Sequence, residues 1–126
     1  MPMFNKHYTR EEARQMLPLV RQWLDELGRV RDLLTGYEER IAAALGVGDD
    51  LGGELINKNV KCLAEAKEIL IRFKEREIQV KDINRGLIDF PAFVGGKEVF
   101  LCWENGEDDI EFWHDLNTGY TGREPL

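Results

Sequence analysis

The side chains best suited to chemistry are five polar residues near the predicted strand ends and turns of the C-terminal third: Arg85, Asp89, Glu107, His114 and Arg123. An arginine fork binds a carboxylate or phosphate through two parallel hydrogen bonds, and a histidine beside acids titrates near neutral pH. This set predicts a catalytic site or a binding site for a small anionic ligand. The alternative is structural: both arginines form ion pairs with Asp89, Glu107 or Asp115 and hold the C-terminal tail in place.

Two other combinations have suitable residue types but an unsuitable predicted geometry. Glu111 and His114 have the spacing of helical di-metal ligands, which works only when both share a helix face. This segment is predicted to be a strand, so they point to opposite faces. Cys102 and His114 are likewise predicted to lie on opposite sheet faces. Carboxylates beside Cys102, from Asp89 and Asp109, would raise the pKa of its thiol, whereas a nucleophilic cysteine needs a lowered pKa.

The acidic turn at residues 107–109 is a weaker alternative, as a binding site for a divalent cation. Oxygen ligands from carboxylates suit calcium and magnesium. Acids on turns also keep small proteins soluble without binding any ion. We predict no cofactor, and no set of metal ligands outside this turn.

A three-stranded antiparallel β-meander is predicted to position these side chains. Gly95-Gly96 and Asn105-Gly106 are typical of two-residue hairpin turns. The first turn predicts that Asp89 pairs with Cys102, and the second predicts that Cys102 pairs with Asp109. Both registers assign the same residues of the middle strand to each face, so the two turns agree with one another.

The predicted sheet has one apolar face, which should pack on helices, and one mixed face. The apolar face collects Ile88, Phe90, Ala92, Val99, Leu101, Trp103, Ile110 and Phe112. The mixed face combines several acids with three aromatic residues, Phe93, Phe100 and Trp113. That composition suits neither a solvated face nor a core, so we interpret it as an interface or a pocket wall. The alternative is that helix ends or the tail after His114 cover it.

Residues 9–80 are predicted to form a long antiparallel helical hairpin. Thr9 and Glu12 fit a capping box, and apolar residues then recur at steps of three and four up to Leu45. A second apolar stripe runs from about Glu54 to Val80, after a turn at residues 46–53.

Pro18 removes a backbone donor and predicts a kink in the first helix. The fold class is therefore α+β in one domain, 1–126, with the hairpin followed by the β segment and tail at 86–126. A helix over residues 9–45 would span roughly 55 Å, more than a small core can cover. We expect both the C-terminal segment and a second subunit to pack on the helices.

Composition limits the classes of partner. The chain has 126 residues and a net charge of −7, and residues 82–126 hold ten acids against three basic residues. This segment should not bind nucleic acid, which needs lysine and arginine; a basic protein partner fits better. No run approaches the length of a membrane span, and two cysteines are too few for a disulfide framework. We expect a cytoplasmic protein without membrane contact.

Three stretches of the sequence carry a family resemblance. They are Tyr8-Thr-Arg-Glu-Glu-Ala13 with Leu17-Pro18, then Val80-Lys-Asp-Ile-Asn-Arg-Gly-Leu-Ile-Asp-Phe-Pro91, and then Leu101-Cys-Trp, Gly106-Glu107, Phe112-Trp-His114, Gly119, Gly122-Arg123 and Pro125-Leu126. Together they resemble a prokaryotic family catalogued as a domain of unknown function, number 2203. The resemblance covers nearly the whole chain and implies no catalytic or binding role for any residue.

The function expected from these observations is that of a non-enzymatic interaction or scaffold protein that forms a homo-oligomer, a dimer or larger, through its helical stripes. The alternative is a small-ligand or catalytic site at the strand ends.

Overall fold

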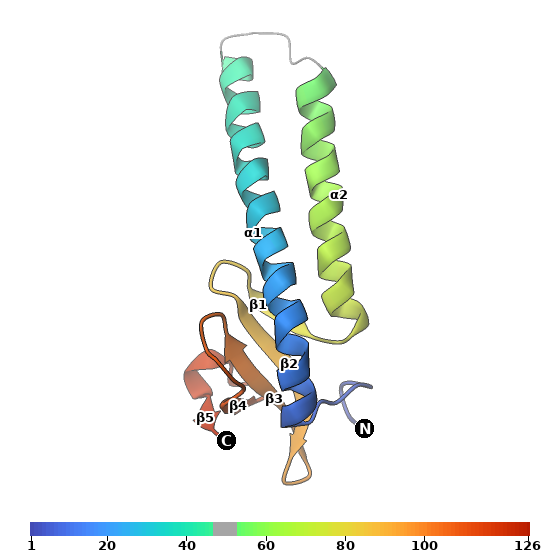
Figure 1. Cartoon of the computed structure of the whole chain (residues 1–126), viewed down its shortest axis with the longest axis vertical. Coiled ribbons are helices and arrows are strands. Elements are labelled where there is room, and N and C mark those ends of the chain that lie inside the picture. The colour runs from blue at the N-terminus through green and yellow to red at the C-terminus, as the bar shows by residue number, and fades with distance from the viewer. Residues whose placement is uncertain (47–52) are drawn as a thin grey trace.

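A computed structural model describes residues 1–46 and 53–126 and confirms an α+β fold with a helical hairpin (Figure 1). The predicted turn at 46–53 lies, apart from its two end residues, outside the described residues. The helices are α1 (Arg10–Gly46) and α2 (Gly53–Glu75). The strands are β1 (Gln79–Asp82), β2 (Leu87–Val94), β3 (Lys97–Glu104), β4 (Phe112–Asp115) and β5 (Glu124–Pro125), with the 3₁₀ helix η1 (Tyr120–Gly122) before β5.

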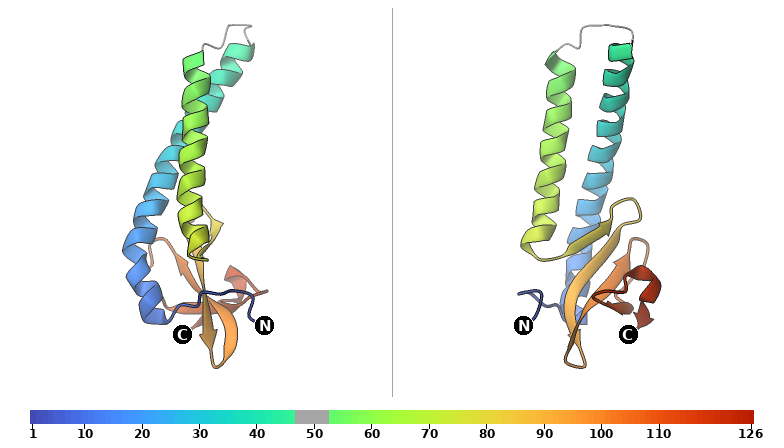
Figure 2. Two further views of the ribbon diagram at one scale, coloured as in Figure 1. Left: turned by 90° about the vertical axis from the view of Figure 1, so that its right-hand side faces the viewer. Right: turned by 180° about the vertical axis from the view of Figure 1, so that it is seen from behind.

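Helix α1 begins at the predicted capping box. The amide of Glu12 donates to the Thr9 hydroxyl, and the amide of Thr9 donates to the Glu12 carboxylate, both at 3.0 Å. The predicted sharp kink at Pro18 does not form: α1 is one continuous helix, and Figure 2 shows it as a smoothly curved rod. Pro18 is exposed, and a helix can curve around its core without interruption.

Helix α2 ends at Glu75, five residues before the predicted end. Glu77 adopts a positive φ of 56°, and two hydrogen bonds close the helix: Ile78 N–H to Phe73 C=O and Glu77 N–H to Lys74 C=O. These bonds form a Schellman motif, which most often has glycine at the left-handed position. Because Glu77 occupies this position, the sequence has no glycine to mark the end of α2. The apolar pattern of the helix also continues through the residues that form strand β1.

The sheet has five antiparallel strands in the order β1-β2-β3-β4-β5, not three. The β2–β3 register is as predicted, with Asp89 opposite Cys102. The predicted β3–β4 register is wrong by three residues, because Cys102 pairs with Phe112 and not with Asp109. The two missed strands, β1 and β5, are only four and two residues long.

The β3–β4 register shifts because the residues after the Asn105-Gly106 turn do not return directly to the sheet. Glu107 N–H donates to Glu104 C=O and closes the turn, but Glu107 C=O then accepts from the Trp103 indole. Ile110 is buried against the helices, and Arg10 holds its carbonyl at 2.7 Å. An odd shift exchanges the faces of a strand. Phe112 therefore lies on the mixed face, and Trp113 packs on the core.

The core lies between the N-terminal half of α1, the end of α2 and the apolar face of the sheet (Figures 1 and 2). Apart from Phe112, every residue predicted for that face is buried. The helix contribution is led by Leu17, Val20, Trp23, Leu27 and Phe73.

The mixed face is covered within the chain, by the N-terminal segment at one end and the tail at the other. Phe4 packs edge-on against Phe100, which is 3% exposed. Glu98 accepts hydrogen bonds from the Met3 and Phe4 amides. These bonds lower the pKa of the Glu98 carboxyl, and the bond from Met3 has the largest effect. Among the three predicted interface aromatics, only Phe93 has an exposed side chain.

Beyond the sheet, the two helices stand alone as a pair (Figure 1). Val30 is the last buried residue of α1, and Cys62 is the first buried residue of α2 within the described part of the chain. We call residues 31–46 and 53–62 the distal hairpin.

Phe90 and Phe93 lie on opposite faces of β2 and test the assignment of the core. Phe90 is 0% exposed and Phe93 is 49% exposed. Phe90→Ala should lower the free energy of unfolding by about 3–5 kcal/mol, because it leaves a cavity in the core. Phe93→Ala should lower it by less than about 1.5 kcal/mol, since Phe93 is half exposed and its aromatic contact is a stacking on His7. Urea denaturation measures both, and equal losses would contradict the assignment.

Candidate functional site

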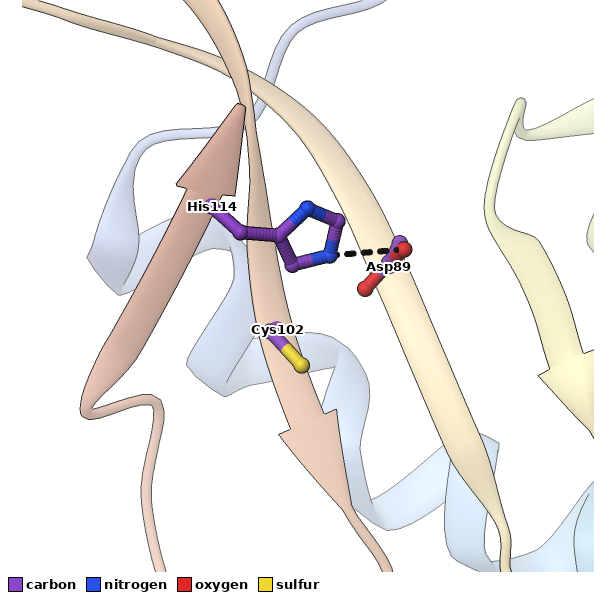
Figure 3. A group of neighbouring side chains, drawn as sticks. All are labelled: Asp89, Cys102 and His114. Carbon is purple, nitrogen blue, oxygen red and sulfur yellow. Dashed lines mark hydrogen bonds and ion pairs between the residues drawn. The ribbon is translucent and has the colours of Figure 1, made fainter. Parts of the chain in front are cut away.

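A buried polar cluster lies on the mixed face of the sheet and consists of Asp89 from β2, Cys102 from β3 and His114 from β4 (Figure 3). All three side chains are at most 2% exposed. One potential ligand atom from each lies within 4.8 Å of the other two. The prediction that Cys102 and His114 occupy opposite faces is wrong, because the three-residue register shift turns His114 toward Cys102.

The imidazole of His114 is fixed at both nitrogens. Nδ1 lies 2.7 Å from the carbonyl oxygen of Asp115, and Nε2 lies 3.0 Å from Oδ2 of Asp89. A carbonyl oxygen only accepts, so Nδ1 carries a proton. The contact between Nε2 and Oδ2 then needs one more proton, because otherwise two acceptors would face each other. Asp89 and His114 thus share one proton and together carry no net charge.

The second carboxylate oxygen of Asp89 has no partner. Oδ1 is buried and makes no hydrogen bond within the described structure. Burial raises the pKa of the Asp89 carboxyl, and the neighbouring His114 opposes this rise. A buried polar atom without a partner is costly and marks a place where an unseen ligand or water fits.

The Cys102 thiol is held in its neutral form. Burial, followed by the negative charge of Asp89, raises its pKa to about 12. Nη1 of Arg123 lies 3.8 Å from Sγ and opposes this shift. The predicted effect of Asp89 on the thiol is confirmed, whereas Asp109 lies elsewhere and binds Arg14 at 2.8 Å.

A cleft of about 330 Å³ reaches this cluster from the surface. Asp89 and His114 line it together with Lys81, Phe100 and the loop of residues 116–120. Cys102 is not part of the cleft lining. A small molecule in the cleft therefore meets the Asp89–His114 pair directly.

The other three predicted site residues belong to a network that fastens the tail and meets the cluster where Arg123 approaches Cys102. Arg123 makes a two-pronged contact with Glu107, and Arg85 donates to Glu104 at 2.9 Å. Both guanidinium groups lie over the Tyr120 ring, at 4.5 and 4.4 Å from its centre. The pair of Arg123 with Glu107 is one that the structural alternative predicted. Arg85 also forms an ion pair, but with Glu104, which was not among the predicted partners.

Arginines also neutralise two carboxylates of the acidic turn at 107–109. Glu107 pairs with Arg123. Asp109 pairs with Arg14, and this hydrogen bond lowers the pKa of the Asp109 carboxyl. The turn thereby connects the sheet to α1 and to the tail.

Comparison with known proteins gives a family but no activity. Residues 6–126 match the family described as "Uncharacterized conserved protein (DUF2203)". The chain belongs to this family. The predicted resemblance to DUF2203 is thus confirmed, and no curated protein and no solved structure matches the chain. No helix within the described residues is long and apolar enough to cross a membrane.

The sequence predicts Asp89 and His114 as site residues and pairs Asp89 with Cys102 as observed, but it places His114 on the wrong face of the sheet. Ile110 is the residue that indicates the correct register. It is an apolar residue between acids, and it is buried from the loop that precedes strand β4. If Ile110 is assigned to the loop, strand β4 starts at Phe112 and His114 faces Asp89.

The reactivity of Cys102 tests the environment of the cluster. At pH 8 in metal-free buffer, iodoacetamide should alkylate Cys102 in the native protein at least about a hundredfold more slowly than in urea-unfolded protein, because both its access and its thiolate fraction are reduced. Mass spectrometry of the Cys102 peptide measures the rate. Equal rates in native and unfolded protein would contradict a buried thiol of high pKa.

Proposed function

We propose that the protein is a non-enzymatic interaction protein that self-associates through its distal hairpin. The observation that carries this proposal is the apolar surface left uncovered there. Val60 on α2 and Leu45 on α1 are 56% and 64% exposed, and Leu63, the first residue of α2 beyond the distal hairpin, is 51% exposed. Several large apolar side chains on two neighbouring helices form an unusual surface for a monomer.

The exposed residues of α2 follow the spacing of a helix interface. Ile56, Val60, Leu63 and Leu70 recur at intervals of four, three and seven residues, which places them on one side of the helix. The α2 side chains directed at α1, such as Ile69 and Phe73, form a different row. Helix α2 therefore has two apolar surfaces, one that packs on α1 and one that is exposed, as expected for a helix that takes part in a larger bundle.

The groove beside this stripe is mostly apolar, although Arg31 and Lys81 also line it. It has a volume of about 520 Å³ and lies where the helices meet β1. Its lining includes Leu27 and Leu34 from α1 and Leu70 from α2. The stripe and groove thus provide a continuous apolar path along the hairpin, suited to a helix from another molecule.

Charge favours a second copy of this chain as the partner. Residues 9–81 hold thirteen basic and fourteen acidic residues, so the hairpin is almost neutral, and the surplus of acids lies in residues 82–126. Two hairpins pairing side by side bring no large like charge together. A strongly basic or acidic partner would find no excess of opposite charge on the hairpin.

We place this assembly in the cytoplasm. Cys62 and Cys102 are both free and buried, which suits a reducing compartment.

Two double variants of α2 test this function. Val60→Gln with Leu63→Gln removes apolar surface from the stripe and should weaken self-association at least about tenfold, equal to about 1.4 kcal/mol. Sedimentation velocity over a concentration series measures the change. The matched control, Lys61→Gln with Glu68→Gln, places the same two residues on the other side of α2 and should leave association unchanged.

The proposal fails if the unmodified protein is monomeric at tens of micromolar. It fails equally if both double variants associate like the parent chain, because the stripe would then carry no contact energy. Circular dichroism before each run establishes that the helices are intact.

A further inference from the structure

We propose that Asp89, Cys102 and His114 bind a transition-metal ion, with zinc as the ion that suits them best. The proposal concerns the sheet and is independent of self-association through the distal hairpin. It also differs from the acidic turn at 107–109, where Glu107 and Asp109 pair with arginines.

The residue types match the preferences of zinc. Carboxylate, thiolate and imidazole are its three common protein ligands, with bonds of about 2.0–2.3 Å. Hard ions such as calcium and magnesium favour oxygen ligands alone, so a thiol and an imidazole select against them. Three strands in succession supply one ligand each, so the sheet itself fixes their relative positions (Figure 3).

The spacing of the ligand atoms is close to that of a bound state. The atoms lie within 4.8 Å of one another, and Nε2 of His114 is 3.0 Å from Oδ2 of Asp89. Ligand atoms around a tetrahedral zinc lie roughly 3–4 Å apart at the bond lengths above. Small side-chain rotations are enough to close the set around an ion.

His114 is already oriented as a metal ligand. Its Nδ1–H donates to the Asp115 carbonyl oxygen, and metal-binding histidines commonly make this type of contact with their second nitrogen. The bond leaves the Nε2 lone pair directed at the cluster. The atom opposite is a carboxylate oxygen, so a positive species must lie between them, either a proton or a metal ion.

The net charge of the cluster is unchanged when one zinc ion, with two positive charges, replaces two protons. Without metal, the cluster carries the proton shared by Asp89 and His114 and the proton on the Cys102 thiol. A zinc ion replaces both protons, bonds form to Oδ2, Nε2 and Sγ, and two protons pass to solvent. The cluster is neutral before and after the exchange, as its burial requires.

The surroundings suit the bound thiolate and an open fourth position. Arg123, 3.8 Å from Sγ, remains as a donor to the thiolate. Within the described residues, no fourth acid, histidine or cysteine belongs to the cluster. The fourth position therefore falls to a water or a small ligand from the 330 Å³ cleft that Asp89 and His114 line.

Cobalt(II) titration of the full chain, stripped of metal with a chelator, tests the site. Cobalt occupies zinc sites, and a bound thiolate gives it a near-ultraviolet charge-transfer band. We expect one cobalt per chain with this band, and we expect zinc to displace it. Calorimetry of zinc binding in buffers of different ionisation enthalpy should show the release of two protons.

The chain provides a matched control in its second buried cysteine. Cys102→Ala should abolish the charge-transfer band, whereas Cys62→Ala, on α2, should retain it. His114→Gln should weaken binding at least tenfold. Absence of the band in the parent protein overturns the proposal without any variant, and so does a band that Cys62→Ala removes and Cys102→Ala keeps.

Discussion

The pairing of β3 with β4 is the constraint on which the rest of this structure depends. It sets Cys102 opposite Phe112 and so assigns every side chain of β4 to a face. In this register His114 turns inward to Asp89, Trp113 joins the core beneath the helices, and Ile110 is free to be buried from the preceding loop. A register without the three-residue shift would place His114 on the helix side and leave the buried carboxylate of Asp89 alone.

The two ends of the molecule differ in how completely they bury their apolar surface. At the sheet end, α1 covers one face, while Phe4 and the tail cover the other, and Arg123 fastens the tail through Glu107. At the far end the hairpin has only two helices and leaves residues such as Val60 exposed. Two helices cannot enclose their own apolar stripes, so this end lacks a layer that the sheet end has. The proposed self-association supplies that layer.

Much of the fold was predictable, because the residue types at helix caps and tight turns, and the alternation of apolar residues along a strand, indicate the local backbone structure directly. The capping box at Thr9, the first hairpin turn and the apolar face of β2 and β3 all followed from such signals. The end of α2 did not, since Glu77 takes a conformation usually reserved for glycine. The β3–β4 register also could not follow from its turn alone. It depends on the bond from Arg10 to the carbonyl of Ile110, a residue 100 positions away in sequence, and on the bond from the Trp103 indole to Glu107. The Asp89–Cys102–His114 cluster was missed for the same reason.

Hydrogen–deuterium exchange at two protein concentrations tests the central claim, that the sheet is complete within one chain whereas the distal hairpin is not. Amides in residues 31–46 and 53–62 should exchange more slowly at tens of micromolar than at sub-micromolar concentration, because association stabilises them. Amides of β2 and β3 should exchange at the same rate at both concentrations. Concentration-independent exchange throughout the distal hairpin would contradict this account.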